Sequence, residues 1–230
     1  MYSVVMTNPS KKIVRKSVGK TSPAGTTSTK KKKNTKAVGK RKTVRVLSSN
    51  IVYAAPVFQV TSDEIIEPSG AKVRRDIIRH PGSVVILAID ERKSKPSVLL
   101  IRQYRYAANQ ELWELPAGRI DEGEDALTAA KRELAEETGY SASEWKLALY
   151  YYASPGFLAE TMSVFAARDL RKGKASPEED ECITSKLVPL KKAVQWVMSG
   201  KVNDGKAIAG VLWAAQKFHI SAGDKGKRQK

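Results

Sequence analysis

The chain has 230 residues, 41% of them apolar, and its 41 lysines and arginines outnumber 24 aspartates and glutamates, giving a formal net charge of +17. This length allows one or two units with a buried core. No apolar run reaches the roughly 18 residues of a helical membrane span, so that class is excluded. The lone cysteine, Cys182, excludes an internal disulfide and a cysteine-based zinc cage. It favours a reducing compartment and predicts a cytoplasmic protein.

The excess positive charge lies at the two ends of the chain. Residues 1–60 hold 14 lysines and arginines and no acid, whereas residues 61–220 hold 23 charges of each sign. Because the N-terminal stretch is rich in Ser, Thr and Lys, it cannot repay the entropy of ordering. We expect a disordered basic tail over residues 1–44 and a basic C-terminal tail over residues 221–230. Any contact with nucleic acid is expected through the basic tail.

Two blocks of strand-forming residues follow the N-terminal tail. β-Branched and aromatic residues recur between residues 44 and 60, and residues 72–79 alternate more loosely. Together they predict a small antiparallel sheet over residues 45–80. Such a sheet is marginal alone, so residues 45–80 are too short to fold by themselves, which favours a dimer.

The remaining body, residues 81–220, alternates strands with helices. The continuous apolar run of residues 84–89 predicts a strand buried on both faces. Further strands are expected at residues 98–104, 111–115, 146–152 and 162–167. Helices are expected at residues 125–138, 191–199 and 206–218, the first of them ended by Gly139. A mixed sheet flanked by helices, an α/β fold, is the economical interpretation.

The first predicted helix carries Glu133, Glu136 and Glu137 on one face, at positions i, i+3 and i+4. Three carboxylates that close repel one another, and a divalent cation would relieve the repulsion. Hard oxygen ligands select Mg²⁺ or Mn²⁺. Arg132 can restrain one carboxylate through a fork-like ion pair. Taken alone, however, the three glutamates also fit an ordinary charged face exposed to solvent.

A longer pattern surrounds these glutamates. Seven residues follow the spacing Gly-x5-Glu-x7-Arg-Glu-(apolar)-x-Glu-Glu-x-Gly-(apolar), with Leu134 and Tyr140 in the apolar slots. This stretch resembles the signature of Nudix hydrolases. Residues 101–106, 114–118 and 154–157 are similar to the ADP-ribose pyrophosphatase branch of that family. Pro155 follows Tyr140 at the spacing of a proline in that branch.

The resemblance implies a Nudix α/β/α sandwich with a mixed central sheet, preceded by the small antiparallel sheet. It also implies Mg²⁺-dependent hydrolysis of the diphosphate of ADP-ribose or a related ADP-sugar, giving AMP and a sugar phosphate through a metal-activated water. The metal ligands that it implies are the Ala117 carbonyl and the carboxylates of Glu133, Glu136, Glu137 and Glu181. Its implied catalytic residues are Glu136, Arg132 and, as the base on an acidic loop, Glu179.

Fixed cations are needed to bind phosphate, and guanidinium groups match its oxygens. Arg105 is the leading candidate, with Arg75 and Arg102 behind it, although an ordinary surface role fits each equally well. The resemblance adds Glu114 and Pro155 to the substrate-binding set. It further implies a homodimer in which the N-terminal sheets are exchanged or closely packed.

The aromatic residues and histidines give weaker signals. An adenine shelf is conceivable at Tyr53 or Phe58, but core packing is the favoured interpretation of both. The two histidines, His80 and His219, show no ligand pattern and are expected to be structural or exposed. The tryptophans are interpreted as core or interface residues; they are Trp113, Trp145, Trp196 and Trp213.

Three alternatives stay open at this point. One is a Nudix hydrolase for another nucleoside diphosphate derivative, and another is a Nudix module that senses a nucleotide without cleaving it. The intact glutamates argue against the sensing module. The third is an RNA-processing protein acting on capped ends, and the neutral body argues against it because no stripe of basic and aromatic residues crosses that body.

Overall fold

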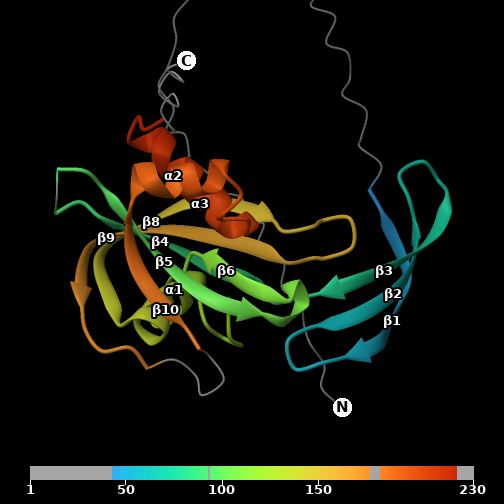
Figure 1. The fold of residues 1–230 in the computed structure, drawn as a ribbon. Coiled ribbons are helices and arrows are strands. Elements are labelled where there is room, and N and C mark those ends of the chain that lie inside the picture. Colours follow the sequence, from blue (N-terminus) through green and yellow to red (C-terminus); the bar gives the residue numbers. More distant parts are fainter. Residues whose placement is uncertain (1–42, 93, 177–181, 222–230) are drawn as a thin grey trace, which may run out of the picture. The chain divides into compact units, whose positions relative to one another are not determined.

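The computed structural model describes residues 43–92, 94–176 and 182–221, and both expected basic tails lie almost wholly outside these ranges. Within them, a three-stranded sheet is followed by a seven-stranded sheet and three α-helices (Figure 1). A mixed α/β architecture with a small leading antiparallel sheet was predicted, and it is confirmed. None of the helices in these ranges is long and apolar enough to cross a membrane.

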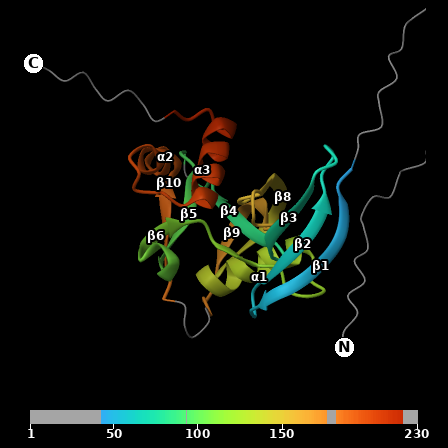
Figure 2. The same cartoon turned by 90° about the vertical axis from the view of Figure 1, so that its right-hand side faces the viewer.

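The leading sheet consists of antiparallel strands in the order β1–β2–β3, with bounds Arg45–Ala54, Gln59–Ile66 and Lys72–Arg79. β1 is the edge strand, as Figure 2 shows, and every one of its ten residues is exposed. At the other edge, Ile78 in β3 exchanges backbone hydrogen bonds with Phe157 and Ala159, which lie between β8 and β9. The sheet is therefore joined to the main body through β3.

The main sheet has the strand order β10–β5–β4–β9–β8, with β6 added beside β5 and β7 beside β4. The neighbours β4 and β9 are parallel, and the other described pairs are antiparallel, so the sheet is mixed. The strand bounds are β4 Ser83–Asp90, β5 Ser97–Arg105, β6 Gln110–Glu114, β7 Ala117–Arg119, β8 Tyr140–Tyr152, β9 Thr161–Lys172 and β10 Thr184–Pro189.

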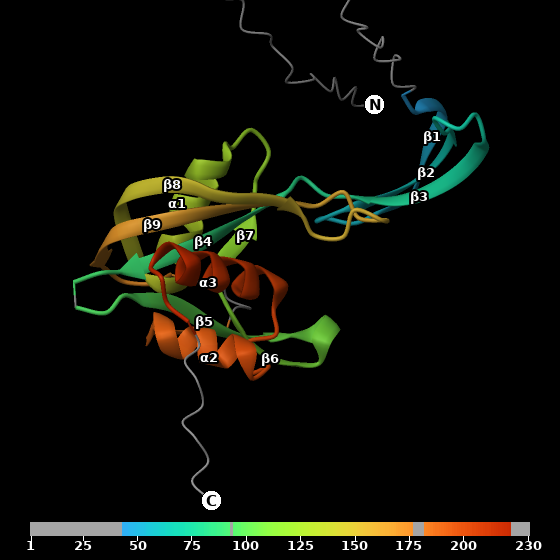
Figure 3. The ribbon, with the colours of Figure 1, turned by 90° about the horizontal axis from the view of Figure 1, so that it is seen from above.

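Helices cover both faces of this sheet, as Figure 3 shows from above. Alternate residues of β4 face two different cores: Val84 and Ile86 pack with α1, while Val85 and Leu87 pack with α2 and α3. This explains why β4 is apolar throughout, as a strand covered on both sides must be. The helix bounds are α1 Ala126–Thr138, α2 Leu190–Met198 and α3 Gly205–Lys217.

Several expectations need correction at the level of elements. β7 and β10 were not predicted, and neither was the short 3₁₀ helix Tyr106–Ala108. The expected strands at residues 84–89 and 98–104 are observed as parts of β4 and β5, which pair with each other only at Ile89–Val98 and Asp90–Ser97. Core packing was also the wrong interpretation of Tyr53, whose side chain is 57% exposed on β1.

Candidate active site

Helix α1 begins and ends where its sequence dictates. The Asp125 carboxylate accepts hydrogen bonds from the backbone N–H groups of Leu127 and Thr128, which have no partner inside the helix. Gly139 ends the helix at φ +71°, and a side chain there would collide with the backbone of Lys174 and Ala175. Both ends of the acidic helix are therefore fixed.

Arg132 is the centre of the charged groups on α1. Its guanidinium donates to the Glu124 carboxylate at 3.1 and 3.2 Å, to Glu133 at 2.7 Å, to Glu136 at 3.0 Å and to the Arg119 carbonyl at 3.1 Å. These bonds raise the pKa of Arg132, and the bond from Arg132 lowers the pKa of Glu124. The Glu124 carboxylate is thus held ionised, and the guanidinium ties all three carboxylates to one point.

The carboxylates of Glu133 and Glu137 lie against consecutive residues of β7. Glu137 is 4% exposed, and its Oε2 accepts the backbone N–H of Ala117 at 3.1 Å. The Glu133 carboxylate lies so close to Gly118 that a Cβ on residue 118 would overlap it. One turn of α1 and the backbone of β7 together form a cluster of oxygen atoms.

This donor set fits a hard divalent cation, although the described residues do not already form a ready-made metal cage. Arg132 engages Glu133 and Glu136, while the Ala117 N–H holds Glu137. Each carboxylate has further lone pairs, and Mg²⁺ commonly takes only one or two protein carboxylates and keeps several waters. Of the predicted ligands, Glu133 and Glu137 thus both lie against β7, beside Gly118 and Ala117.

Two cations lie beside this cluster, on either side of Glu114. This carboxylate is fully buried and receives Nε and Nη2 of Arg105 at 2.8 and 2.9 Å, and the Lys206 ammonium lies 3.3 Å away. Burial alone would raise the pKa of Glu114, but Arg105 and Lys206 together lower it. For Lys206 the burial that would lower its pKa is outweighed by Asp204 and Glu114, so that pKa is raised. Both ammonium and guanidinium remain charged at neutral pH.

These cations open onto a pocket of about 300 Å³ between β4, β7 and α3. The opposite wall holds the Glu160 carboxylate, which accepts a hydrogen bond from Ser83 Oγ at 2.6 Å and lies 3.8 Å from His80 Nδ1. Because His80 Nδ1 accepts the Gly82 N–H, it carries no proton of its own there. The lining consists of His80, Ser83, Arg105, Ala117, Gly118, Arg119, Glu160, Met162 and Lys206.

The structure brings some of the predicted substrate residues together and leaves others apart. Arg105 and Glu114 form one ion pair beside the cluster, as described. Arg75 is instead paired with Glu67 inside the leading sheet, at 2.6 Å, and Arg102 is paired with Glu111 across β5 and β6. Pro155 is an exposed residue in the β8–β9 connection. The predicted base Glu179 and the predicted ligand Glu181 lie outside the described residues.

Several residues of the pocket were not predicted to belong to the site, among them Arg119, Met162 and Lys206. Ser83 and Glu160 are 77 positions apart in the chain, and no local pattern marks either of them. His80 was expected to be structural, which its bond to Gly82 supports, yet it also lines the pocket. Strand pairing was the missing signal: β4 and β9 run parallel from Ser83 and Met162, which brings the residues just before both strands together.

The chain is similar to several known proteins. The family model for the NUDIX domain matches residues 79–209, more than half of the chain. The ADP-ribose pyrophosphatase of Mycobacterium tuberculosis is 35% identical over 72% of this chain and 80% of its own length. The ADP-ribose pyrophosphatase of Bacillus subtilis is 31% identical over 77% and 96%. The methanol dehydrogenase activator of Bacillus methanolicus is 30% identical over 76% and 95%.

A solved structure, described as an ADP compounds hydrolase, superimposes with a TM-score of 0.66 over 76% of this chain and 94% of its own. At 20% identity this likeness concerns the fold alone. The matching family model and the pyrophosphatase relatives decide the family. The chain belongs to the Nudix hydrolases, which act on phosphoric anhydrides, and within them to the ADP-ribose pyrophosphatase branch.

Proposed function

We propose that this protein hydrolyses the diphosphate of ADP-ribose or a related ADP-sugar, giving AMP and a sugar phosphate, in a Mg²⁺-dependent reaction in the cytoplasm. The observation that carries the proposal is the meeting of two features: carboxylates of α1 that lie against β7, and beside them a pocket lined by Arg105, Arg119 and Lys206. A diphosphate with an attached sugar needs both, since its charge must be neutralised while its hydroxyl groups are recognised.

Mg²⁺, or Mn²⁺ in its place, would be held by Glu133, Glu136, Glu137 and the Ala117 carbonyl. When bound, it would neutralise charge on the diphosphate and make water a better nucleophile at neutral pH. Arg132 would keep the ligand carboxylates aligned, as its bonds to Glu133 and Glu136 support. Fixing donors before the reaction avoids a reorganisation cost at the transition state.

Arg105 and Lys206 would bind the phosphate oxygens from one wall of the pocket. Their charges are already fixed by Glu114, and Lys206 is also paired with Asp204 at 2.8 Å. On the facing wall, Glu160 offers carboxylate oxygens, which accept hydrogen bonds from hydroxyl groups such as those of a ribose. The pocket therefore has a different chemistry for each half of a sugar diphosphate.

The general base remains Glu179 in this proposal, with Glu181 as a further ligand. The support comes from the residue just before their segment: the Ser176 N–H donates to the Glu136 carbonyl at 2.9 Å. Ser176, immediately before residues 177–181, therefore lies against the last turn of α1. A base must reach the attacking water within hydrogen-bond distance, directly or through one other water.

The function is tested by a hydrolysis panel with and without Mg²⁺, containing ADP-ribose, ADP-glucose, GDP-mannose, NADH, diadenosine polyphosphates and capped RNA. We expect ADP-ribose or another ADP-sugar to be cleaved fastest, with AMP and the sugar phosphate identified by mass spectrometry. Cleavage of capped RNA alone, or of no compound, would contradict the proposal.

Glu137→Gln tests the metal site within this panel. We expect turnover to fall by a factor of about 100 or more, comparable to the loss of one electrostatic contact to a transition state. Glu122→Gln is the matched control, because Glu122 is an exposed carboxylate just before the same helix. Wild-type turnover in Glu137→Gln would remove Glu137 from the metal ligands. Glu179→Gln should lower turnover too, and an unchanged rate would place the base elsewhere.

We also propose a homodimer formed through the leading sheet. Apolar side chains of β1 are exposed to a degree unusual for a soluble monomer, with Val46, Ile51 and Val52 at 59%, 61% and 59%. A second copy is the occupant that accounts for this surface, because an edge strand with apolar side chains pairs readily. Size-exclusion chromatography with light scattering should show twice the 25.3 kDa chain mass. Ile51→Glu should shift the protein towards monomer, whereas Met198→Glu, at an exposed apolar site on α2, should not.

A further inference from the structure

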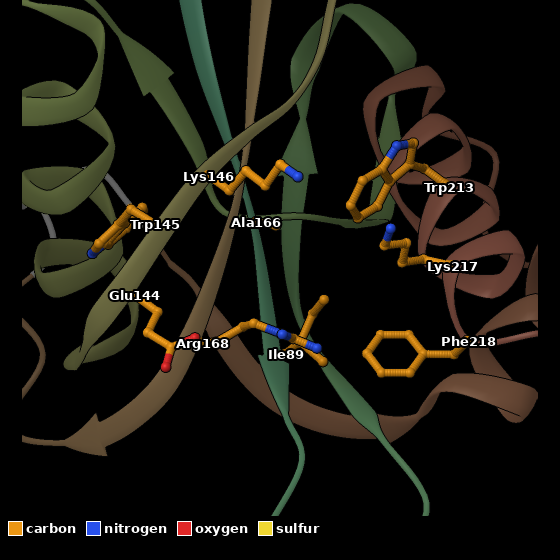
Figure 4. Close-up of a pocket in the computed structure, with 9 residues that line it drawn as sticks. All are labelled: Ile89, Glu144, Trp145, Lys146, Ala166, Arg168, Trp213, Lys217 and Phe218. Carbon is orange, nitrogen blue, oxygen red and sulfur yellow. The ribbon is translucent and has the colours of Figure 1, made fainter.

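A second pocket lies at the other end of the main sheet, on the face that α2 and α3 cover. Its volume is about 210 Å³, and it is formed where β8 and β9 meet the end of α3 (Figure 4). β4 connects the two pockets: Ser83 lines the first and Ile89 the second. Six residues of extended strand separate them by about 20 Å, so the second pocket is no extension of the first.

Basic side chains from three elements converge on this second pocket. Lys146 comes from β8, Arg168 from β9 and Lys217 from the last turn of α3. Arg168 is neutralised by Glu91, with contacts at 2.7 and 2.8 Å. By contrast, Lys146 and Lys217 have no salt bridge to any residue within the described ranges. Figure 4 shows both ammonium groups extending into the same space beside the ring of Trp213.

Two unpaired ammonium groups that share a hollow repel each other, and a bound anion would turn this repulsion into attraction. Glu144 also lines the pocket and stands opposite Arg168 in the strand register. With Arg168 offset by Glu91, the two lysines and the one carboxylate of Glu144 leave a net charge of one positive. Compact ammonium groups on flexible stems bind phosphate as point charges.

Aromatic rings supply the other half of the pocket. Trp213 and Phe218 are partly buried against the core below α3, which holds them in place. The Arg168 guanidinium lies 5.6 Å from the Phe218 ring centre, so Phe218 already has a partner. Trp213 lines both this pocket and an adjoining hollow of about 260 Å³ that also contains Lys217. A planar ring can therefore be placed next to Trp213 while an attached anion reaches Lys146 and Lys217.

We propose that this pocket is a second, non-catalytic binding site for a nucleoside monophosphate. The phosphate would lie between the Lys146 and Lys217 ammonium groups, and the base would stack on Trp213. Flat bases stack on aromatic side chains with useful affinity whatever their identity. This site does not depend on the proposed hydrolysis, because it shares no lining residue with the first pocket.

The test follows the indole N–H signal of Trp213 by NMR in the full-length, metal-free protein, with Trp213→Phe used to assign it. AMP should move the signal in a saturable way, whereas adenosine or inorganic phosphate at equal concentration should move it much less. In the double variant Lys146→Gln with Lys217→Gln, the apparent Kd for AMP should rise at least tenfold.

The matched control is Lys192→Gln with Lys201→Gln, which removes the same charge from two lysines over the ring of Trp196. It should leave the AMP titration unchanged, and thermal melting should show both double variants folded. A Trp213 signal that AMP does not move, or moves equally in both double variants, would overturn the proposal. A short single-stranded oligonucleotide acting far below the AMP concentration would also overturn it and assign the pocket to nucleic acid.

Discussion

Gly118 shows how a single missing side chain makes the oxygen cluster possible. The space that a Cβ would fill at this position is taken by the Glu133 carboxylate. No positive φ is involved, so the glycine is required for close approach and not for its backbone freedom. The signature contains two such glycines with different purposes, because Gly139 is needed for its left-handed backbone as well.

Gly118→Ala is therefore expected to disable the site while the protein still folds. The methyl group would push the Glu133 carboxylate away from β7, and we expect Mg²⁺-dependent turnover to fall by a factor of about 100, as for other misplaced catalytic groups. Gly205→Ala is the control: residue 205 has open space around its Cα at the start of α3 and should keep full turnover. Wild-type kinetics in Gly118→Ala, measured beside an unchanged melting temperature, would contradict this account of the cluster.

At the residue scale, the sequence predicted the charged residues of α1 better than the residues that line the neighbouring pocket. The signature spacing places Arg132 and the glutamates within two turns of one helix, and local geometry is enough to bring them together. The pairing of Glu114 with Lys206 could not be predicted in this way, since the two residues are on β6 and α3. The contact between Ser83 and Glu160 could not be predicted for the same reason, because the two residues are far apart in the sequence.

At the scale of elements, Glu114 joins three parts of the fold. It lies on β6, receives Arg105 from β5 and faces Lys206 from α3, while Gly210 allows α3 to approach Leu115 just after β6. A buried charge that loses a partner is costly, so these contacts act together. The ion pairs beside the proposed substrate pocket are thus also contacts that hold the hairpin and the helix in place.

Glu114→Gln should lower the free energy of unfolding by about 1–3 kcal/mol at pH 7, the range for a poorly satisfied buried group. Because the pKa of Glu114 is lowered in the folded state, its contribution is present above the ordinary glutamate pKa and is lost as pH falls through the folded value. The difference between wild type and variant should therefore shrink in acid. Urea unfolding at pH 7 and about pH 3 measures it.

Glu111→Gln provides the comparison for that experiment. Glu111 lies on the same strand and pairs with Arg102, but both side chains are about half exposed. Exposed pairs contribute roughly 0–1 kcal/mol. We expect a small effect on the free energy of unfolding at pH 7, and an equal loss in both variants would contradict the special role of the buried pair.

Element prediction succeeded where hydrophobic pattern, caps and length agreed. Asp125, the buried alanines and Gly139 mark α1 to within one residue, and the apolar run marks β4. β7 was missed because three residues that include a glycine are too few to show an alternation of apolar and polar side chains. The segment is a strand because it pairs with β4. β8 was predicted too short because its first residues are mostly polar and are held by β9.

For the whole molecule, the first and second pockets are both built by residues between His80 and Phe218. None of the described site residues comes from the basic N-terminal stretch. Deleting residues 1–44 should therefore leave kcat/KM for a small ADP-sugar within about twofold, since salt screens long-range interactions between charges. A collapse of that rate, with the truncated protein still folded, would show that the stretch takes part in catalysis.

The alternation of β4 between two cores has a consequence for how the protein can change over evolutionary time. Inserting or deleting one residue in this strand would turn every side chain beyond the change to the opposite face. The packing of both hydrophobic cores would then be lost at once, and β4 would no longer connect the two pockets as it does now. Substitutions of similar volume should be accepted there, whereas changes of length should accumulate in the turn at residues 91–96, outside the strand.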